Sequence, residues 1–451
     1  MDKPLPQIRR AEILAALSHA LDLTEGQPRG HCIRVCWIGM HLGKCLNLTP
    51  WELTELYYTL LLKDLGCSSN AARICQLYLA DDHAFKADFK LIDGSLLQAL
   101  RFVISHTGLE RGMAERFRAI IKIMRNGGEI SRELIEARCT RGAEIARIMG
   151  FGDDVARAIQ CLDEHWDGRG KPEGLSLRAI PIASQIALMS QVADVFFMSS
   201  GRDAAVREIQ NRANTWFDAS LVEVFVAMAE DEEVWNALRS GDIMQWVLAL
   251  EPQEHVARAD DEYLDRVAKG FALVVDSKSP FTSGHSQRVA VYADLIAERL
   301  GLDADHRRWL RRAALLHDIG KLAISNTILD KPDKLTDAEY TVMKSHASVS
   351  GEILADIPAF SALVPVARGH HERLDGKGYP LGLKDKEICL ETRIVSVADV
   401  FDALTADRPY RKAMPTSQAL GIMAQDVGKA FDGRCFNALV DSLKRADRAA
   451  A

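Results

Sequence analysis

Apolar residues along this chain recur about every three to four positions, the spacing that places them on one face of a helix. Runs in which apolar and polar residues alternate strictly, as they do in half-buried strands, are scarce. Aromatic residues, which are enriched in strands, make up only 7% of the chain. The sequence therefore predicts an all-α fold.

Three helices can be placed in the second half of the chain. The first covers residues 305–315, where apolar side chains line one stripe and arginines fall largely on the other face. The next begins at Thr336, which has capping-box spacing with Glu339. A third runs from about Thr392 through Leu404. The stripe of the first helix consists of Leu310, Ala313, Ala314 and Leu315, and its arginines are Arg307, Arg308, Arg311 and Arg312.

The two halves of the chain are similar to each other. Residues 31–72 align with 285–326 at a constant offset and without a gap. Residues 138–197 align with 346–405 at a second constant offset, and this match pairs two glycine-rich turns. Constant offsets over segments of this length indicate an internal repeat, in which one structural unit occurs twice.

The repeat predicts two tandem helical domains in a chain of 451 residues, which is long enough for more than one core. The boundary is expected between Leu250 and Glu262, where Pro252 and a charged run interrupt the apolar pattern. We therefore assign residues 1–250 to the first domain and residues 251–451 to the second.

Composition and charge narrow the classes of function. The formal net charge is −7, so no overall positive field exists to bind the phosphates of duplex DNA or RNA. Nine cysteines without a C-x-x-C pair, and an N-terminus without signal-peptide features, favour a reducing, cytoplasmic location. The longest apolar stretch, residues 180–198, is interrupted by polar residues such as Gln185 and Asp194, so we expect no membrane span.

The candidate chemistry lies in the second half, where histidines and aspartates cluster. His317 and Asp318 directly follow the apolar run 313–316, where two polar groups would be buried at a cost unless something such as a metal compensates. The adjacent pair His370 and His371 repeats this pattern after another apolar run. Imidazoles and carboxylates in combination suit Fe, Mn or Zn. The full set consists of His285, His317, Asp318, His346, His370, His371 and Asp399.

Five motifs in this half, over roughly residues 262–440, resemble those of the HD-GYP subgroup of the HD metal-dependent phosphohydrolases in order and spacing. They are GHSQRV (284–289), LLHDIGK (315–321), His346 with Ile353-Leu354, GHHERLDGKGYP (369–380) and SVADVFDALTADRPYR (396–411). HD-GYP proteins hydrolyse cyclic dinucleotides, chiefly cyclic di-GMP and in some members 3′,3′-cyclic GMP-AMP. The resemblance implies that the second domain is a helical HD-type domain with an intact metal site.

The resemblance also implies a role for each residue of the set. Asp318 would bridge two divalent metal ions, for which Fe or Mn is expected. Lys321 would reach the same pocket and contact the phosphate or the nucleophilic water. The other ligands would be His285, His317 and Asp399 for one ion and His346, His370 and His371 for the second.

Substrate contacts follow from the same resemblance. Arg408 and Arg411 would grip the phosphates, since guanidinium groups bind phosphate oxygens bidentately without titrating. Gly378, Tyr379 and Pro380 would either contact the substrate or a partner, or form a rigid turn that supports the preceding histidines. The sequence leaves both interpretations of this turn open.

The first half has lost most of these ligands, and of the seven positions only His31 and Asp64 are unchanged. Lys63 and Arg138 are cations where a metal ligand should stand, so this domain should not assemble a dinuclear centre. We expect a degenerate HD-like domain that is regulatory or dimerising, through which the chain forms a homodimer or binds a partner protein. The equivalent positions hold His31, Lys63, Asp64, Arg138, Leu162, Asp163 and Gln191.

These features lead to one main hypothesis, a phosphodiesterase that opens a cyclic dinucleotide to a linear product at a dinuclear metal centre. Two alternatives stay open. An HD hydrolase of nucleoside phosphates would lack the glycine-rich turn 369–380, and a catalytically silent cyclic-dinucleotide receptor would not need the intact ligand set. We expect no third metal ion, because Phe281 stands four residues before His285, where HD-GYP proteins with three ions carry a glutamate.

Overall fold

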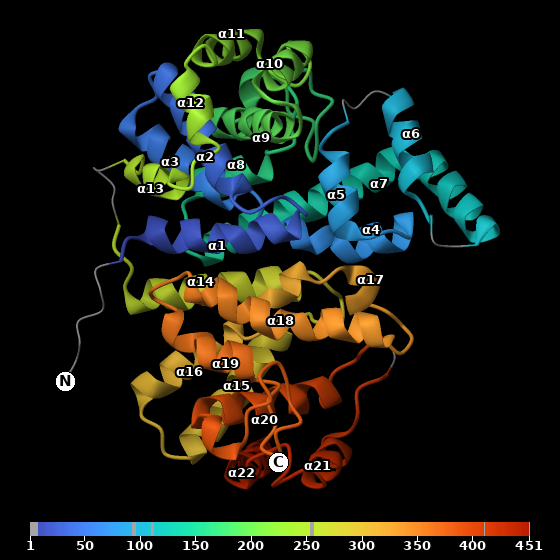
Figure 1. Cartoon of the computed structure of the whole chain (residues 1–451), viewed down its shortest axis with the longest axis vertical. Helices are drawn as coiled ribbons and strands as arrows, with labels where there is room; N and C mark the ends of the chain where they lie inside the picture. Colours follow the sequence, from blue (N-terminus) through green and yellow to red (C-terminus); the bar gives the residue numbers. More distant parts are fainter. Residues whose placement is uncertain (1–7, 93–95, 110–111, 253–256, 410, 451) are drawn as a thin grey trace. The chain divides into compact units, whose positions relative to one another are not determined.

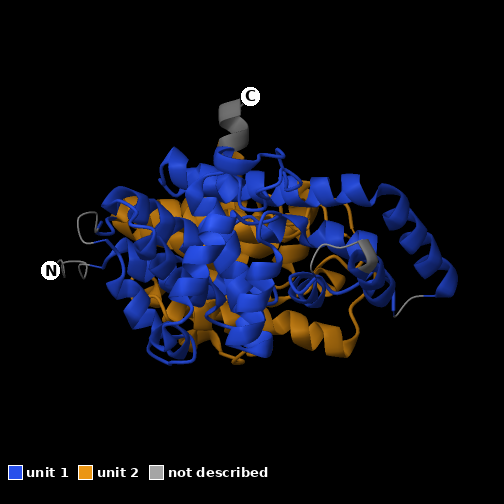
Figure 2. Cartoon of the chain, turned by 90° about the horizontal axis from the view of Figure 1, so that it is seen from above, with its two compact units in different colours: residues 1–260 blue, residues 261–451 orange. Residues whose placement is uncertain are grey.

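The computed structural model describes residues 8–92, 96–109, 112–252, 257–409 and 411–450. Within these ranges the chain forms helices and only isolated β-bridges, so the all-α prediction is confirmed. The chain divides into two compact units, Met1–Asp260 and Asp261–Ala451, which Figure 2 colours blue and orange. Part of the predicted boundary stretch, residues 253–256, lies outside the described residues, as do residues 1–7.

In its described residues the first unit contains thirteen α-helices and two short 3₁₀ helices (Figure 1). In chain order these are α1 (Arg10–Thr24), α2 (His31–Cys45), α3 (Pro50–Leu62), η1 (Cys67–Asn70), α4 (Ala71–Tyr78), α5 (Asp82–Phe89), α6 (Leu96–His106), α7 (Met113–Ile148), α8 (Asp153–Gln160), η2 (Leu177–Ala179), α9 (Ile182–Ser200), α10 (Arg202–Asn211), α11 (Ala219–Met228), α12 (Glu232–Ala237) and α13 (Ile243–Ala249).

The second unit has the same character, with long helices joined by short ones. In chain order its helices are α14 (Asp261–Asp276), α15 (His285–Arg299), α16 (Ala304–Leu316), η4 (Ile319–Ala323), α17 (Asn326–Leu329), α18 (Asp337–Ala355), η5 (Ser361–Leu363), α19 (Val364–Gly369), η6 (Asp385–Glu387), α20 (Leu390–Thr405), α21 (Thr416–Ala424) and α22 (Gly433–Ala450).

Corresponding helices pack in the same way within each unit. In the first unit α2 contacts α3 and α9, and in the second α15 contacts α16 and α20. The 3₁₀ helix η1 packs on α7 as η4 packs on α18. Both α2 and α15 begin directly after a glycine in the left-handed region, Gly30 at φ 88° and Gly284 at φ 68°, a conformation that favours glycine. The sequence repeat is therefore also a repeat of packing.

The three helices predicted in the second half are present as α16, α18 and α20. Thr336 caps α18, and its capping box with Glu339 is formed as predicted. The glycine-rich segment 375–380 is not helical, again as predicted. The bounds differ from the expected ones by only one or two residues.

The arginines of α16 pair with carboxylates of the neighbouring helices. Arg312 is buried, and its guanidinium donates to Asp261 and Asp265 of α14. Arg307 donates to Asp294 of α15 through Nε at 3.0 Å and Nη2 at 2.8 Å. A buried guanidinium is tolerated only when it is paired, so these ion pairs tie α16 to both of its neighbours.

Helix α9 is long and apolar enough, by length and composition, to cross a membrane. However, 72% of its most apolar window is buried inside the protein, and it packs on α2 and α10. Core helices of globular proteins pass the same test of length and composition, and α9 is mostly buried as such a helix is.

Gly320 allows η4 to lie directly against α18. A Cβ atom at this position would lie 2.1 Å from the carbonyl oxygen of His346 and 2.6 Å from the amide nitrogen of Ser350. No side chain fits such a space, and the Gly320 N–H instead donates to Ser350 Oγ at 2.9 Å. The contact brings the residues just before Gly320 next to His346.

We expect Gly320→Ala to destabilise the second unit, because the added methyl group would overlap the backbone of α18. Overpacking of this kind costs roughly 1–3 kcal/mol. The matched control is Gly421→Ala in α21, where a Cβ atom meets nothing within 4 Å and alanine is the better helix former. Denaturant unfolding of both variants measures the difference, and a Gly320→Ala protein as stable as the unmodified one would contradict the packing argument.

Candidate metal centre

The second unit brings together all seven side chains that the sequence singled out, and each comes from the end or the inner face of a helix. His285 begins α15, His317 directly follows α16, Asp318 precedes η4, His346 lies in α18, His370 and His371 follow α19, and Asp399 lies in α20. Six of the seven are buried, and the side chain of His371 is 23% exposed.

Asp318 lies at the centre of this cluster. Its Oδ2 is 3.3 Å from Nε2 of His285 and 3.2 Å from Nε2 of His317. Its Oδ1 is 3.4 Å from Nε2 of His346 and 3.6 Å from Nε2 of His370. Each carboxylate oxygen therefore faces a different pair of imidazoles, which is an arrangement suited to a carboxylate that bridges two cations.

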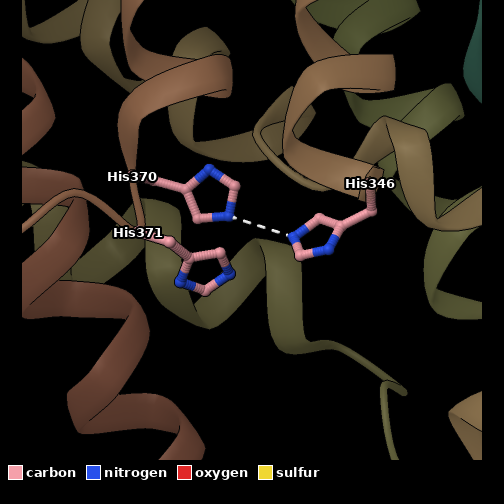
Figure 3. A group of neighbouring side chains, drawn as sticks. All are labelled: His346, His370 and His371. Atoms are coloured by element: carbon pink, nitrogen blue, oxygen red, sulfur yellow. Dashed lines mark hydrogen bonds between the residues drawn. The ribbon is translucent and has the colours of Figure 1, made fainter. Parts of the chain in front are cut away.

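The remaining ligand atoms divide into the same two groups. Nε2 of His285 and the Oδ1 atom of Asp399 are 3.3 Å apart, and together with His317 they form one set of three potential ligands within 4.8 Å of one another. The second set consists of His346, His370 and His371, which point toward one another in Figure 3. Nε2 of His346 and Nε2 of His370 are 3.4 Å apart in this set.

Backbone carbonyl groups fix which nitrogen of three imidazoles faces the centre. Three histidines donate from Nδ1 to a carbonyl one helical turn earlier, so the lone pair of Nε2 points inward in the neutral form. These bonds join His317 to Ala314 at 2.6 Å, His346 to Met343 at 2.6 Å and His370 to Ala367 at 2.8 Å. The imidazoles are thus oriented as metal ligands before any ion binds.

Asp402 orients the fourth of these imidazoles, and the sequence analysis missed it. Its Oδ2 accepts a 2.7 Å hydrogen bond from Nδ1 of His285, and Arg288 donates Nε to its Oδ1 at 2.6 Å and Nη2 to its Oδ2 at 3.0 Å. Two signals could have found it. Asp402 lies one helical turn after Asp399, and its counterpart in the first repeat, Asp194, is also an aspartate.

Burial and charge make the centre fit a cation. Oδ1 of Asp318 and Nε2 of His317 are buried without a hydrogen bond of good geometry, which is costly for atoms that carry lone pairs. Burial alone would raise the pKa of Asp318, but the nearby His317 and Lys321 outweigh it and hold that pKa well below its usual range. Burial lowers the pKa of His346 to about 3, so this imidazole is neutral. An ionised carboxylate beside a neutral imidazole is a pair of donors that divalent metals bind well.

Lys321 lies beside Asp318 in the 3₁₀ helix η4. Residues three apart are nearly eclipsed in a 3₁₀ helix, so Nζ of Lys321 comes within 2.5 Å of Oδ2 of Asp318. The side chain of Lys321 is 13% exposed, so it lies at the edge of the buried cluster.

Glu372 directly follows the histidine pair and holds the glycine-rich turn next to the pair through hydrogen bonds. This carboxylate is buried and accepts hydrogen bonds from three backbone amides of the turn. The donors are Leu381 at 2.6 Å, Gly382 at 3.1 Å and Leu383 at 2.9 Å. The turn therefore holds the backbone at His370 and His371 in place.

Gly378, Tyr379 and Pro380 take part in the same support. A Cβ atom at Gly378 would lie 2.5 Å from the backbone of the residues that follow the histidine pair, so only glycine fits. The ring of Tyr379 packs on that of His371, with 4.8 Å between the ring centroids, and Pro380 continues the turn. These contacts favour the supporting role for Gly378, whereas Tyr379 borders the centre itself.

The contacts of the Arg411 guanidinium were not predicted from the sequence. Its guanidinium donates to the carbonyl oxygens of Ala403, Leu404 and Lys412 and so caps the end of α20. The Arg408 N–H donates to the carbonyl oxygen of Arg411 at 2.7 Å, which places both arginines in one turn after α20. Residue 410 between them lies outside the described residues.

Comparison with known proteins agrees with this geometry. The profile of the HD domain family matches residues 118–221 and 271–435, which together make up more than half of the chain. The protein named 3′3′-cGAMP-specific phosphodiesterase 3 of Vibrio cholerae serotype O1 is 50% identical over 433 residues, covering 96% of this chain and 94% of that protein. The chain belongs to the HD domain family.

Two further relatives of this HD protein differ in how much they cover. A cyclic di-GMP phosphodiesterase response regulator of Xanthomonas campestris pv. campestris is 40% identical over 209 residues, which is 45% of this chain and 54% of that protein. A crystal structure of a cyclic GMP-AMP specific phosphodiesterase of V. cholerae has a TM-score of 0.65 and 45% identity, covering 97% of this chain and 98% of that one. The resemblance to HD-GYP proteins is thus confirmed, and it extends over both units.

We expect Asp402→Ala to weaken metal binding by about 10–100-fold, because the substitution frees the His285 ring to rotate away from the centre. The matched control is Asp194→Ala, which removes the equivalent bond to His31 in the first unit and should leave the metal affinity of the protein unchanged. Competition for Mn²⁺ with a coloured chelator measures both variants. Equal affinity of Asp402→Ala and the unmodified protein would show that Asp402 does not orient a ligand.

Proposed function

We propose that the second unit hydrolyses a phosphodiester bond of a cyclic dinucleotide and releases a linear dinucleotide, with 3′3′-cGAMP as the preferred substrate. The observation that carries this proposal is Asp318, whose two oxygens face separate pairs of imidazoles in a buried pocket. Similarity over nearly the whole chain to a protein named 3′3′-cGAMP-specific phosphodiesterase supports the choice of substrate.

The pocket would hold two divalent ions, with Fe or Mn suited to its mixed nitrogen and oxygen donors. When bound, such ions generate hydroxide near neutral pH and neutralise charge on the phosphate. One set of ligands would be His285, His317, Asp318 and Asp399, and the other His346, His370, His371 and Asp318. Phe281, in the turn before α15, offers no donor atom, which supports two ions over three.

The protein's own groups would bind and orient the phosphodiester. The Lys321 ammonium lies at the edge of the centre and can donate to a phosphate oxygen or hold the attacking water. We also propose phosphate contacts for Arg408 and Arg411, since the three bonds of Arg411 to carbonyls do not involve its Nε–H. Tyr379, packed on His371, would border the bound nucleotide.

For the first unit we propose a regulatory or dimerising role in a cytoplasmic protein. Its ligand positions hold a leucine, a glutamine and two cations, so hydrolysis would be confined to the second unit. A repeat that lacks the catalytic residues but keeps the helical packing can serve as a surface for a second copy or for another protein.

Product analysis tests the proposed reaction. The full chain, loaded with Mn²⁺ or Fe²⁺, is incubated separately with 3′3′-cGAMP and cyclic di-GMP, and the products are separated by chromatography. We expect both to be opened to linear dinucleotides, with 3′3′-cGAMP turned over faster. Binding without turnover of either compound would favour the receptor interpretation, and hydrolysis of nucleoside phosphates alone would favour a plain HD phosphohydrolase.

Asp318→Ala should abolish hydrolysis and most metal binding, because one residue contributes to both ligand sets. The matched variant Asp64→Ala changes the equivalent position of the first unit, and its turnover per folded molecule should stay close to that of the unmodified protein. Rates at saturating substrate and the metal content of each protein check this asymmetry. Equal losses in the two variants would show that both units take part in the reaction.

A further inference from the structure

The first unit contains a buried lysine where the second has a histidine of the metal centre. Nζ of Lys63 lies 3.2 Å from Nε2 of His31 and 2.9 Å from Oε1 of Gln191, and it also binds Oδ2 of Asp64. The side chains of Lys63 and Asp64 are fully buried. In the repeat, Lys63 corresponds to His317, and its three partners correspond to His285, Asp399 and Asp318. The ammonium thus contacts the counterparts of all the other ligands of the first ion.

A second cation lies at the counterpart of the other ligand set. Arg138 corresponds to His346, and its guanidinium binds the carboxylate of Asp163, which corresponds to His371. Both side chains are 15% exposed, so this ion pair is largely shielded from water. The third position of the set holds Leu162, which has no donor atom.

We infer that the Lys63 ammonium and the Arg138 guanidinium take the places of the two metal ions in the first unit, which thereby contains a centre permanently filled by its own side chains. The inference rests on the proposed ligand sets of the second unit for its correspondences. Its consequence is that the first unit folds and keeps its structure without metal.

The protonation of the site supports this assignment. Nδ1 of His31 is 2.7 Å from Asp194, as Nδ1 of His285 is from Asp402, so Nε2 faces the ammonium in the same orientation. Burial together with the charge of Lys63 lowers the pKa of His31 to about 4, which leaves a neutral imidazole to accept the hydrogen bond. Burial opposes the charge of Lys63, but Asp64 outweighs it and raises the pKa of the lysine above its usual range.

A further group of potential metal ligands in the first unit is also neutralised by lysines. Glu25, Asp64 and Cys67 offer ligand atoms within 4.8 Å of one another. Nζ of Lys90 lies 2.8 Å from Glu25, and Lys63 already binds Asp64. The described carboxylates of this group are therefore paired with protein cations, as expected of a unit that uses no metal.

Removal of the internal cation is the first test. Lys63→Met keeps the unbranched apolar stem but removes the ammonium group, which leaves the buried Asp64 without its cation. The first unit should therefore unfold at a lower temperature, and α2 and α9 should exchange amide hydrogens faster. Lys44→Met, an exposed lysine at the end of α2, is the control and should change neither. Unchanged melting and exchange in Lys63→Met would overturn the inference.

Restoration of the ligands is the second test, and it does not depend on phosphodiesterase activity. In the full chain carrying Asp318→Ala, the pair Lys63→His and Gln191→Asp recreates the donor set of the first ion beside His31 and Asp64. We expect a further equivalent of Co²⁺ to bind relative to Asp318→Ala alone, with the visible absorption of a nitrogen and oxygen site. A variant that is folded by circular dichroism but binds no additional Co²⁺ would overturn the assignment, whatever the activity of the second unit.

Discussion

A buried carboxylate surrounded by imidazoles needs a cation, and each unit of this protein is arranged around that need. Removing an ionised carboxylate from water costs several kcal/mol unless a positive charge compensates. In the second unit the carboxylates of Asp318, Asp399 and Asp402 around His285 outweigh burial and raise the pKa of this histidine to about 10. Without a cation to compensate the negative charge of these carboxylates, the close packing of the helices that carry them would be unfavourable.

In both units a glycine allows two helices to lie in direct backbone contact beside the buried aspartate. Gly66 in the first unit approaches the carbonyl oxygen of Arg138 as Gly320 approaches that of His346, and in each case a Cβ atom would lie nearer than 2.5 Å. The aspartate that precedes each glycine is thereby held against the neighbouring helix. The first unit keeps this close contact although α7 has no histidine at the position of His346. The contact is therefore a feature of the fold and not only of the candidate metal centre.

The fold class and the members of the histidine and aspartate cluster could be predicted, the first from helical periodicity and the second from polar residues after apolar runs together with the resemblance to HD-GYP motifs. Helical periodicity identified α16, α18 and α20, and polar residues after apolar runs, such as His317 and His370, marked the centre. Asp402 and Arg411 could not be assigned in the same way, since an aspartate or an arginine at the end of a helix usually faces solvent. Their roles depend on which ring or carbonyl group the fold brings beside them.

Charge balance explains why the substitutions in the first unit belong together. In the second unit the proposed ligand set of the first ion contains two carboxylates, Asp318 and Asp399, whereas in the first unit the single positive charge of Lys63 is paired with one carboxylate, Asp64. The other carboxylate position is accordingly a neutral amide, Gln191, which accepts a hydrogen bond from the ammonium without adding charge. A lysine with two buried carboxylates would leave one negative charge uncompensated, and a glutamine without the lysine would leave Asp64 unpaired, so either change alone is unfavourable. In this proposal the loss of metal binding and the gain of an internal cation are therefore two aspects of a single electrostatic requirement.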